Sequence, residues 1–144
     1  MASVVDFQIT NFQNIHIMIE NELRLGNLLF DEKSNQIFEV QFSDLIAMQK
    51  GEIDYYSRVA ITEKLLLNSQ ILKSKDCFFF EFTKKGSGDV ITIFIKKENG
   101  YWFYGVENSI LDSVSINKID FIDEIQNIVF FLSGEELVFS STEP

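Results

Sequence analysis

Histidine and cysteine carry much of the acid–base and nucleophilic chemistry of proteins, and each occurs once in this chain of 144 residues, as His16 and Cys77. On a strand, His16 would share a face with Glu20, which could form an acid–base pair, but an ordinary, partly exposed strand residue is the favoured interpretation. Cys77 precedes three phenylalanines, an apolar setting that favours a structural cysteine over a reactive one. A Ser–His–Asp triad would have to use His16, and a His/Cys zinc cage needs more ligands than the chain offers. We therefore predict no catalytic residues and no enzymatic activity.

Carboxylates are the other groups whose spacing could do chemistry. Asp120, Asp123 and Glu124 would lie on one side of a helix, where their oxygens could hold Mg²⁺ or Ca²⁺. Acidic first turns are also routine, because the N-terminal end of a helix is electrically positive. Residues 86–88 (Gly-Ser-Gly) lack the Gly-Lys-Ser/Thr that completes a phosphate loop, so they predict a hairpin turn. We predict neither a metal nor a cofactor.

The formal net charge of -10 restricts the classes of partner. Nucleic-acid binding needs clustered Lys and Arg, and an anionic membrane repels an acidic surface, so we expect neither partner. The charge is uneven: residues 107–144 hold eight acids and one base, whereas residues 1–106 hold 14 acids and 11 bases. The acidic end fits a solvated face that aids solubility, or a docking surface for a basic protein.

The chain shows no targeting signal. No apolar run approaches the roughly 18 residues of a membrane span. Residues 1–12 have neither the basic region nor the apolar core of a signal peptide. The expected location is therefore cytoplasmic.

Aromatic residues are abundant, with 15 phenylalanines, and they form one unusual run at 101–104, Tyr-Trp-Phe-Tyr. Alternation along a strand sends two of these four side chains to each face, so one pair would be only partly covered. Tyr and Trp are the residues that most often anchor protein interfaces. The predicted anchors are Tyr101, Trp102 and Tyr104, with Tyr55 and Tyr56 as a second candidate pair.

Hydrophobic periodicity predicts the elements that position these residues. In the first half, alternation of apolar and polar residues predicts strands near 5–9, 15–19, 23–30 and 38–42. A polar turn is expected at 31–35, a short helix capped by Ser43 ends at Gly51, and a longer helix is expected over 57–75.

The second half has clearer patterns. Strands are predicted at 77–84, 90–97 and 101–106, and 90–97 is apolar on both faces, which predicts an interior strand. Asn99-Gly100 predicts a type I′ hairpin turn. The stripe of Ile and Val from Asn117 to Leu132 predicts a helix capped by Asn117, and 137–139 predicts a last short strand. These elements predict one α+β domain over 1–144, with antiparallel sheets of about seven strands and two main helices, in the order strands, helix, strands, helix.

In size, acidity and mixture of strands and helices, the whole chain resembles bacterial immunity proteins, which bind and block a cognate toxin, often a nuclease. The resemblance rests on no motif. It implies a basic protein partner whose active site is covered by acidic side chains that mimic phosphate. The candidates for that role are Asp120, Asp123, Glu124, Glu135 and Glu136.

Two alternatives stay open. The many phenylalanines could line the pocket of a small-ligand-binding or enzymatic α+β domain. An acidic secretion chaperone would also be small and α+β, although those proteins usually begin with a helix and this chain begins with a strand pattern.

Overall fold

The structure, a computed structural model, describes residues 23–75, 77–108 and 115–140. The chain divides into two compact units, Met1–Val59 and Ala60–Pro144. Two compact units do not by themselves make two domains, so a single domain stays a prediction. The strands predicted at 5–9 and 15–19, together with His16 and Glu20, lie outside the described residues.

The first unit holds a three-stranded antiparallel sheet. Its central strand β1 (Leu28–Asp31) lies between β2 (Gln36–Glu39) and β3 (Tyr56–Arg58). The sequence predicts two of these strands, and both are displaced toward the polar turn that joins them. Asn35 closes that turn with a φ of 60°, which asparagine tolerates better than most residues.

A short helix, α2 (Phe42–Gln49), follows this hairpin. The Gln41 backbone N–H donates to Asp44 Oδ2 at 2.8 Å and so satisfies one donor at the helix start. Ser43 lies inside the helix, so its predicted capping role is wrong. The side chains that form the core of this unit are Leu23, Leu29, Val40 and Met48.

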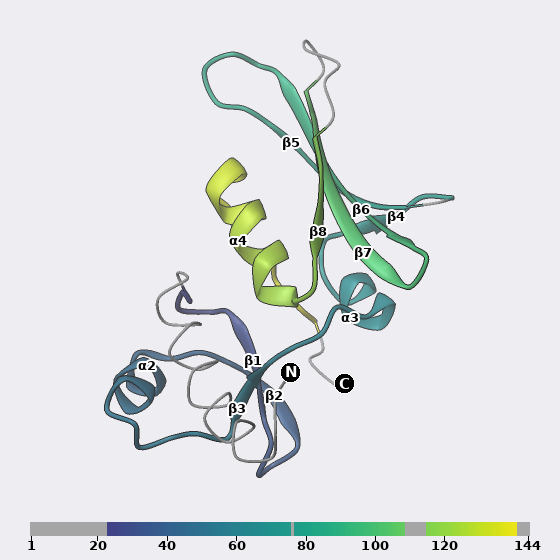
Figure 1. The fold of residues 1–144 in the computed structure, drawn as a ribbon. Helices are drawn as coiled ribbons and strands as arrows, with labels where there is room; N and C mark the ends of the chain where they lie inside the picture. Colours follow the sequence, from purple (N-terminus) through teal and green to yellow (C-terminus); the bar gives the residue numbers. More distant parts are fainter. Residues whose placement is uncertain (1–22, 76, 109–114, 141–144) are drawn as a thin grey trace. The chain divides into compact units, whose positions relative to one another are not determined.

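The second unit is built on a five-stranded antiparallel sheet, visible in Figure 1. Its strands, in spatial order, are β4 (Leu72–Lys73), β5 (Phe78–Thr83), β6 (Val90–Glu98), β7 (Tyr101–Asn108) and β8 (Ser115–Ile119). The central place of β6 confirms the interior strand. Asn99 and Gly100 have φ of 53° and 83°, as a type I′ turn requires.

The core of this unit lies between the sheet and α4 (Ile122–Ser133), which runs along one side of the sheet (Figure 1). On β6, Ile93 and Ile95 are almost fully buried. Their neighbours on β5, Phe78 and Phe80, are buried as well. Burial of each such side chain contributes about 1.5–3 kcal/mol. The helix supplies Ile122, Ile125 and Val129, and the short α3 (Glu63–Leu67) supplies Leu65 and Leu66.

The helix predicted over 57–75 is wrong except for α3. Thr62 breaks it, because Thr62 Oγ1 accepts the Leu65 backbone N–H at 3.2 Å and acts as an N-cap in the middle of the predicted span. The helix then ends at Asn68. β-Branched residues before Thr62 favour extended backbone, which is what the structure shows there.

The helix predicted over 117–132 begins five residues late. Asn117 and Ile119 belong to β8, where Asn117 pairs with Tyr104, so Asn117 is not a helix cap. Ile119 fits the apolar stripe of a helix and the inward face of a strand equally well, and pairing with β7 decides between the two.

The short strand predicted at 137–139 is absent from the described residues. The Val138 backbone N–H donates instead to Gln70 Oε1 at 2.7 Å, and Ser140 N–H donates to the Asn68 carbonyl at 2.7 Å. These loop contacts satisfy backbone groups that a strand ladder would have used.

The described residues therefore contain eight strands and three helices. This confirms an α+β fold with antiparallel sheets. The predicted numbers of strands and helices, and their order, agree only roughly with the structure, because the chain forms two separate sheets and a third helix.

A close backbone approach shapes the face of the sheet opposite to Ile93 and Ile95. Phe94 of β6 lies directly across from Gly105 of β7. A Cβ atom at position 105 would come within 2.3 Å of Phe94 Cζ and 2.7 Å of Phe94 Cε2. The missing side chain therefore lets the ring lie over the glycine, which buries Gly105.

We expect Gly105→Ala to lower the free energy of unfolding by about 1–3 kcal/mol, because the new methyl group displaces the Phe94 ring. In a Phe94→Ala background the same change should cost less, since nothing then occupies the space. Urea denaturation of the two single variants and the double variant measures this coupling. Equal costs in both backgrounds would contradict the ring-over-glycine arrangement.

Candidate functional site

The acids at the start of α4 do not form one exposed cluster. Asp123 is only 5% exposed and interacts within the chain, whereas Asp120 is exposed and its Oδ1 lies 3.7 Å from Lys118 Nζ. Glu124 Oε1 accepts the backbone N–H groups of Asp120 and Phe121, both at 3.1 Å. Glu124 therefore caps the helix, and Asp120 is the one member of this group with an exposed side chain.

The acids beyond the other end of α4 are placed differently. Glu135 and Glu136 are exposed, directly after Gly134, whose φ of 75° ends the helix. Ser133 Oγ accepts the Glu135 backbone N–H at 3.0 Å and donates to the Val129 carbonyl at 2.6 Å. The backbone at Glu135 is thus held in place while its carboxylate faces solvent.

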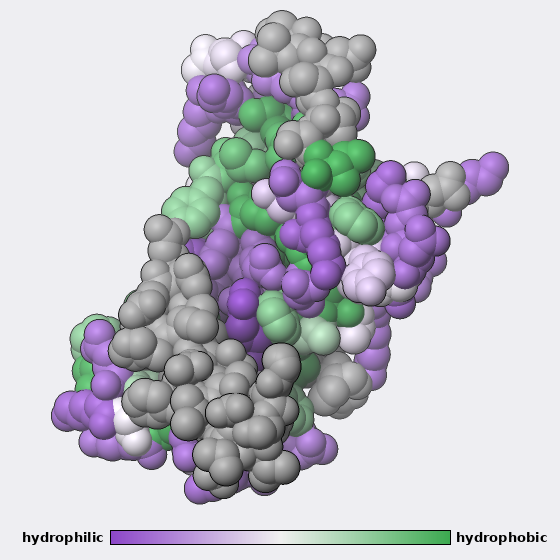
Figure 2. All heavy atoms as spheres, in the orientation of Figure 1, coloured by the Kyte–Doolittle hydropathy of each residue, from purple (hydrophilic) through white to green (hydrophobic). Residues whose placement is uncertain are grey.

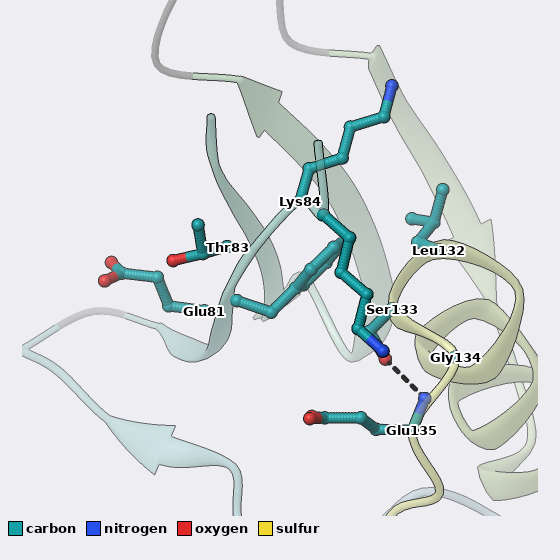
Figure 3. A pocket seen from close by; sticks show the side chains of 9 residues that line it. Glu81, Thr83, Lys84, Leu132, Ser133, Gly134 and Glu135 are labelled. Carbon is teal, nitrogen blue, oxygen red and sulfur yellow. Dashed lines mark hydrogen bonds between the residues drawn. The ribbon is translucent and has the colours of Figure 1, made fainter. Parts of the chain in front are cut away.

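Glu135 also lines a hollow of about 630 Å³ between the end of β5 and the C-terminal end of α4 (Figure 3). We call it the α4-end hollow. In Figure 3 the side chains of Glu81 and Thr83 on β5 point away from α4, so Glu135 is the carboxylate that the helix end brings to the hollow. The lining residues are Glu81, Phe82, Thr83, Lys84, Lys85, Leu132, Ser133, Gly134 and Glu135.

Two large apolar side chains are exposed at the last turn of α4, Phe131 at 61% and Leu132 at 42%. With Glu135 and Glu136, which follow directly after the helix, they form what we call the α4-end surface. Val138 is also exposed, but its backbone is bonded to Gln70 and it is not part of this surface. Apolar anchors surrounded by charged residues are the usual make-up of a protein–protein interface.

The three predicted aromatic anchors divide between two faces. As the alternation predicts, Tyr101 lies on one face of β7, and Trp102 and Tyr104 lie on the other. Tyr101 is 56% exposed, and Lys118 Nζ lies 4.7 Å from its ring centroid. Trp102 is half-buried, with its ring centroid 5.9 Å from that of Phe78. The three side chains therefore cannot meet one flat partner surface together.

Trp102 lines a second hollow, of about 320 Å³, that the sequence analysis missed. It gathers three lysines in an acidic protein, and Lys97 Nζ lies 5.7 Å from the Trp102 ring centroid. Cys77 lines it too and is half-buried, so its setting is more polar than expected. The lining residues are Ile61, Thr62, Glu63, Lys73, Lys75, Cys77, Phe78, Lys97 and Trp102.

The second aromatic pair divides between a loop and the core: Tyr55 lies in the loop before β3, whereas Tyr56 packs against the core of the first unit. The Tyr56 hydroxyl donates to Asp44 Oδ1 at 3.2 Å, and its ring centroid lies 4.6 Å from that of Phe38. Burial, with the nearby Asp44 carboxylate, raises the pKa of Tyr56 to about 12. Tyr55 is half-buried, and Lys33 Nζ lies 4.0 Å from its ring centroid.

Compared with known protein families, curated proteins and solved structures, the chain shows no match. Within the described part of the chain, no three His, Cys, Asp or Glu side chains gather where they could hold a metal ion. None of the helices described is long and apolar enough to cross a membrane.

The placement of the acids predicts different consequences for Glu124 and Glu135. Glu124→Ala should lower the free energy of unfolding by about 1 kcal/mol, because it removes the acceptor for two backbone donors. Glu124→Gln should keep most of that stability, since glutamine also serves in this capping arrangement. Glu135→Ala is the control and should change stability by less than about 0.5 kcal/mol.

Thermal or urea unfolding of the three variants measures this difference. Equal stability of Glu124→Ala and Glu135→Ala would contradict a capping role for Glu124.

Proposed function

We propose that this protein is an acidic binding protein that neutralises a basic protein partner, most plainly as an immunity protein that covers the active site of a cognate toxin. The observation that carries the proposal is the α4-end surface, where Phe131 and Leu132 are exposed at the end of α4 and Glu135 and Glu136 follow directly after it. Buried apolar anchors supply most of the affinity of such interfaces, and charges around them guide association.

The acidic surface suits a partner that acts on a polyanion. Proteins that bind nucleic acids gather Lys and Arg around their sites to contact phosphates. Carboxylates held at a fixed position can occupy such a site in place of phosphate oxygens. Ser133 fixes the backbone of Glu135, and the exposed carboxylate is accessible to a partner.

The burial of the acids revises which of them contact the partner. Asp123 is buried and Glu124 caps α4, so we assign both to the fold. The proposed contacts are Glu135 and Glu136, with Asp120 as an outlying exposed acid that adds to the attractive field. Cytoplasmic location and the absence of catalysis belong to this same proposal.

One observation favours the alternative of a small-ligand domain. The hollow that holds Trp102 brings Lys73, Lys75 and Lys97 together, and lysines attract anionic groups. Trp102 is the only tryptophan of the chain, so quenching of tryptophan fluorescence by a small anion would favour this alternative.

The proposal is tested by reversing charge at the α4-end surface with Glu135→Lys/Glu136→Lys. The control is Glu32→Lys/Glu52→Lys, an equal change of charge at exposed positions of the first unit. In affinity capture from the source cells, the unchanged protein and the control should retain the same basic protein, and the α4-end variant should lose it. Added back to that partner, the unchanged protein should inhibit the activity of the partner.

Association and dissociation rates measured at several salt concentrations should show whether Glu135 and Glu136 contact the partner directly or only attract it from a distance. If Glu135 and Glu136 enter the partner's site, each truncation to Ala should cost about 2–5 kcal/mol of binding, chiefly through faster dissociation. If they only steer, association should slow with salt and dissociation should not change. Retention of the partner by the α4-end variant, or capture of acidic proteins only, would contradict the proposal.

A further inference from the structure

The five-stranded sheet has a second face that α4 does not cover. Side chains alternate along each strand, so the residues of β6 that point away from the buried Ile91, Ile93 and Ile95 define it. We call it the open face. Figure 2 shows hydrophobic side chains at the surface over this sheet, between hydrophilic ones.

The register arranges the open face as three successive rows that cross the strands. The middle row is apolar: Leu72, Phe79, Phe94, Gly105 and Ile116. The row on one side is acidic: Glu81, Thr92 and Glu107. The row on the other side is basic: Lys96, Phe103 and Lys118.

The apolar row is flat, with exposed ends and half-buried phenylalanines between them. Leu72 is 59% exposed and Ile116 is 52% exposed, at the two ends of the row. Between them the Phe94 ring lies over Gly105, so no side chain stands up from β7 at the centre of the row. A flat apolar strip of this kind suits the face of another sheet, since stacked sheets pack about 10 Å apart.

The acidic and basic rows on either side of the apolar row are arranged so that each can face the oppositely charged row of a second copy. A rotation of 180° about an axis along the apolar row, between two stacked copies, exchanges the two flanking rows. The acidic row of one copy then lies over the basic row of the other, and the apolar rows meet. Glu107 of one copy would then lie over β7 of the other copy. There its carboxylate would be flanked by Lys96 on β6 and Lys118 on β8.

From this arrangement we propose that the open face binds a second copy of this chain, as a symmetric face-to-face dimer. Such an interface uses the same surface patch on both subunits, and each charge contact occurs twice. A purely basic partner would meet Lys96 and Lys118 unfavourably, whereas a second copy meets both rows with opposite charge. The proposal does not depend on the proposed function, because that function uses the α4-end surface.

Both lysines already have acidic neighbours within the chain. Lys96 Nζ lies 3.7 Å from Glu98 Oε2, and Lys118 Nζ lies 3.7 Å from Asp120 Oδ1. Exposed pairs at this distance contribute little, and an ammonium group has three donors. Each lysine can therefore also bind a carboxylate of the second copy.

The size of the open face sets the strength of the dimer. Five strands about 4.8 Å apart and three rows about 6.8 Å apart give a footprint of roughly 20 by 20 Å. Two such faces would bury on the order of 1,000 Å² of accessible surface, which is the lower limit for a specific interface. We therefore expect a dissociation constant in the micromolar range.

The test uses two single reversals in the full chain, Glu107→Lys and Lys118→Glu. Each places like charges opposite each other twice in the dimer and should weaken it by about tenfold or more. Mixed in equal amounts, the two variants should form a heterodimer, because at positions 107 and 118 each lysine of the first variant then faces a glutamate of the second. The control is Glu52→Lys, which changes an exposed acid of the first unit and should leave the dimer intact.

Sedimentation equilibrium at about 5–200 µM protein and about 50 mM salt measures these states. Lys96→Glu replaces Lys118→Glu if the latter unfolds after losing its contact with Tyr101. Recovery of dimer on mixing shows that both variants are folded. An unchanged protein that stays monomeric, single reversals that leave the dimer unaffected, or a mixture that stays monomeric would each overturn the proposal.

Discussion

The second unit depends on one constraint: β6 is apolar along one face and carries Val90 and Phe94 among polar residues on the other, so both faces have apolar side chains to cover. Between β5 and β7 its backbone groups are paired on both sides, and Ile91, Ile93 and Ile95 are buried on the side of the core. On the opposite face no helix of the described residues provides cover. Phe94 covers part of this face by lying over Gly105, which leaves a flat apolar strip among the described residues.

The acidic residues of the C-terminal third have two roles, one in the fold of α4 and one at the surface. At the start of α4, Asp123 is buried and Glu124 caps the helix by accepting the backbone N–H groups of Asp120 and Phe121. Beyond its other end, Glu135 and Glu136 face solvent beside exposed apolar residues. Excess negative charge in residues 107–144 is therefore partly used by the fold and partly exposed at the surface, where we propose that it meets a partner.

Much of the sheet could be predicted from local patterns, whereas the site could not. Alternation and the Asn99-Gly100 turn predict β5, β6 and β7 because those signals depend on neighbours in sequence. Local pattern misplaces the start of α4 because Ile119 suits a strand and a helix alike, and only pairing with β7 decides. The lysines around Trp102 and the three rows of the open face come from register between separate strands, which no single stretch of sequence contains.

The account rests on β6 as the interior strand of the sheet. Amide hydrogen exchange under native conditions tests this most directly, because it reports the free energy of opening each backbone hydrogen bond. We expect the amides of residues 91–95 to exchange most slowly, with opening free energies close to that of global unfolding, and those of the edge strand β8 to exchange faster. Amides of β6 that exchange as fast as those of β8 would contradict the account.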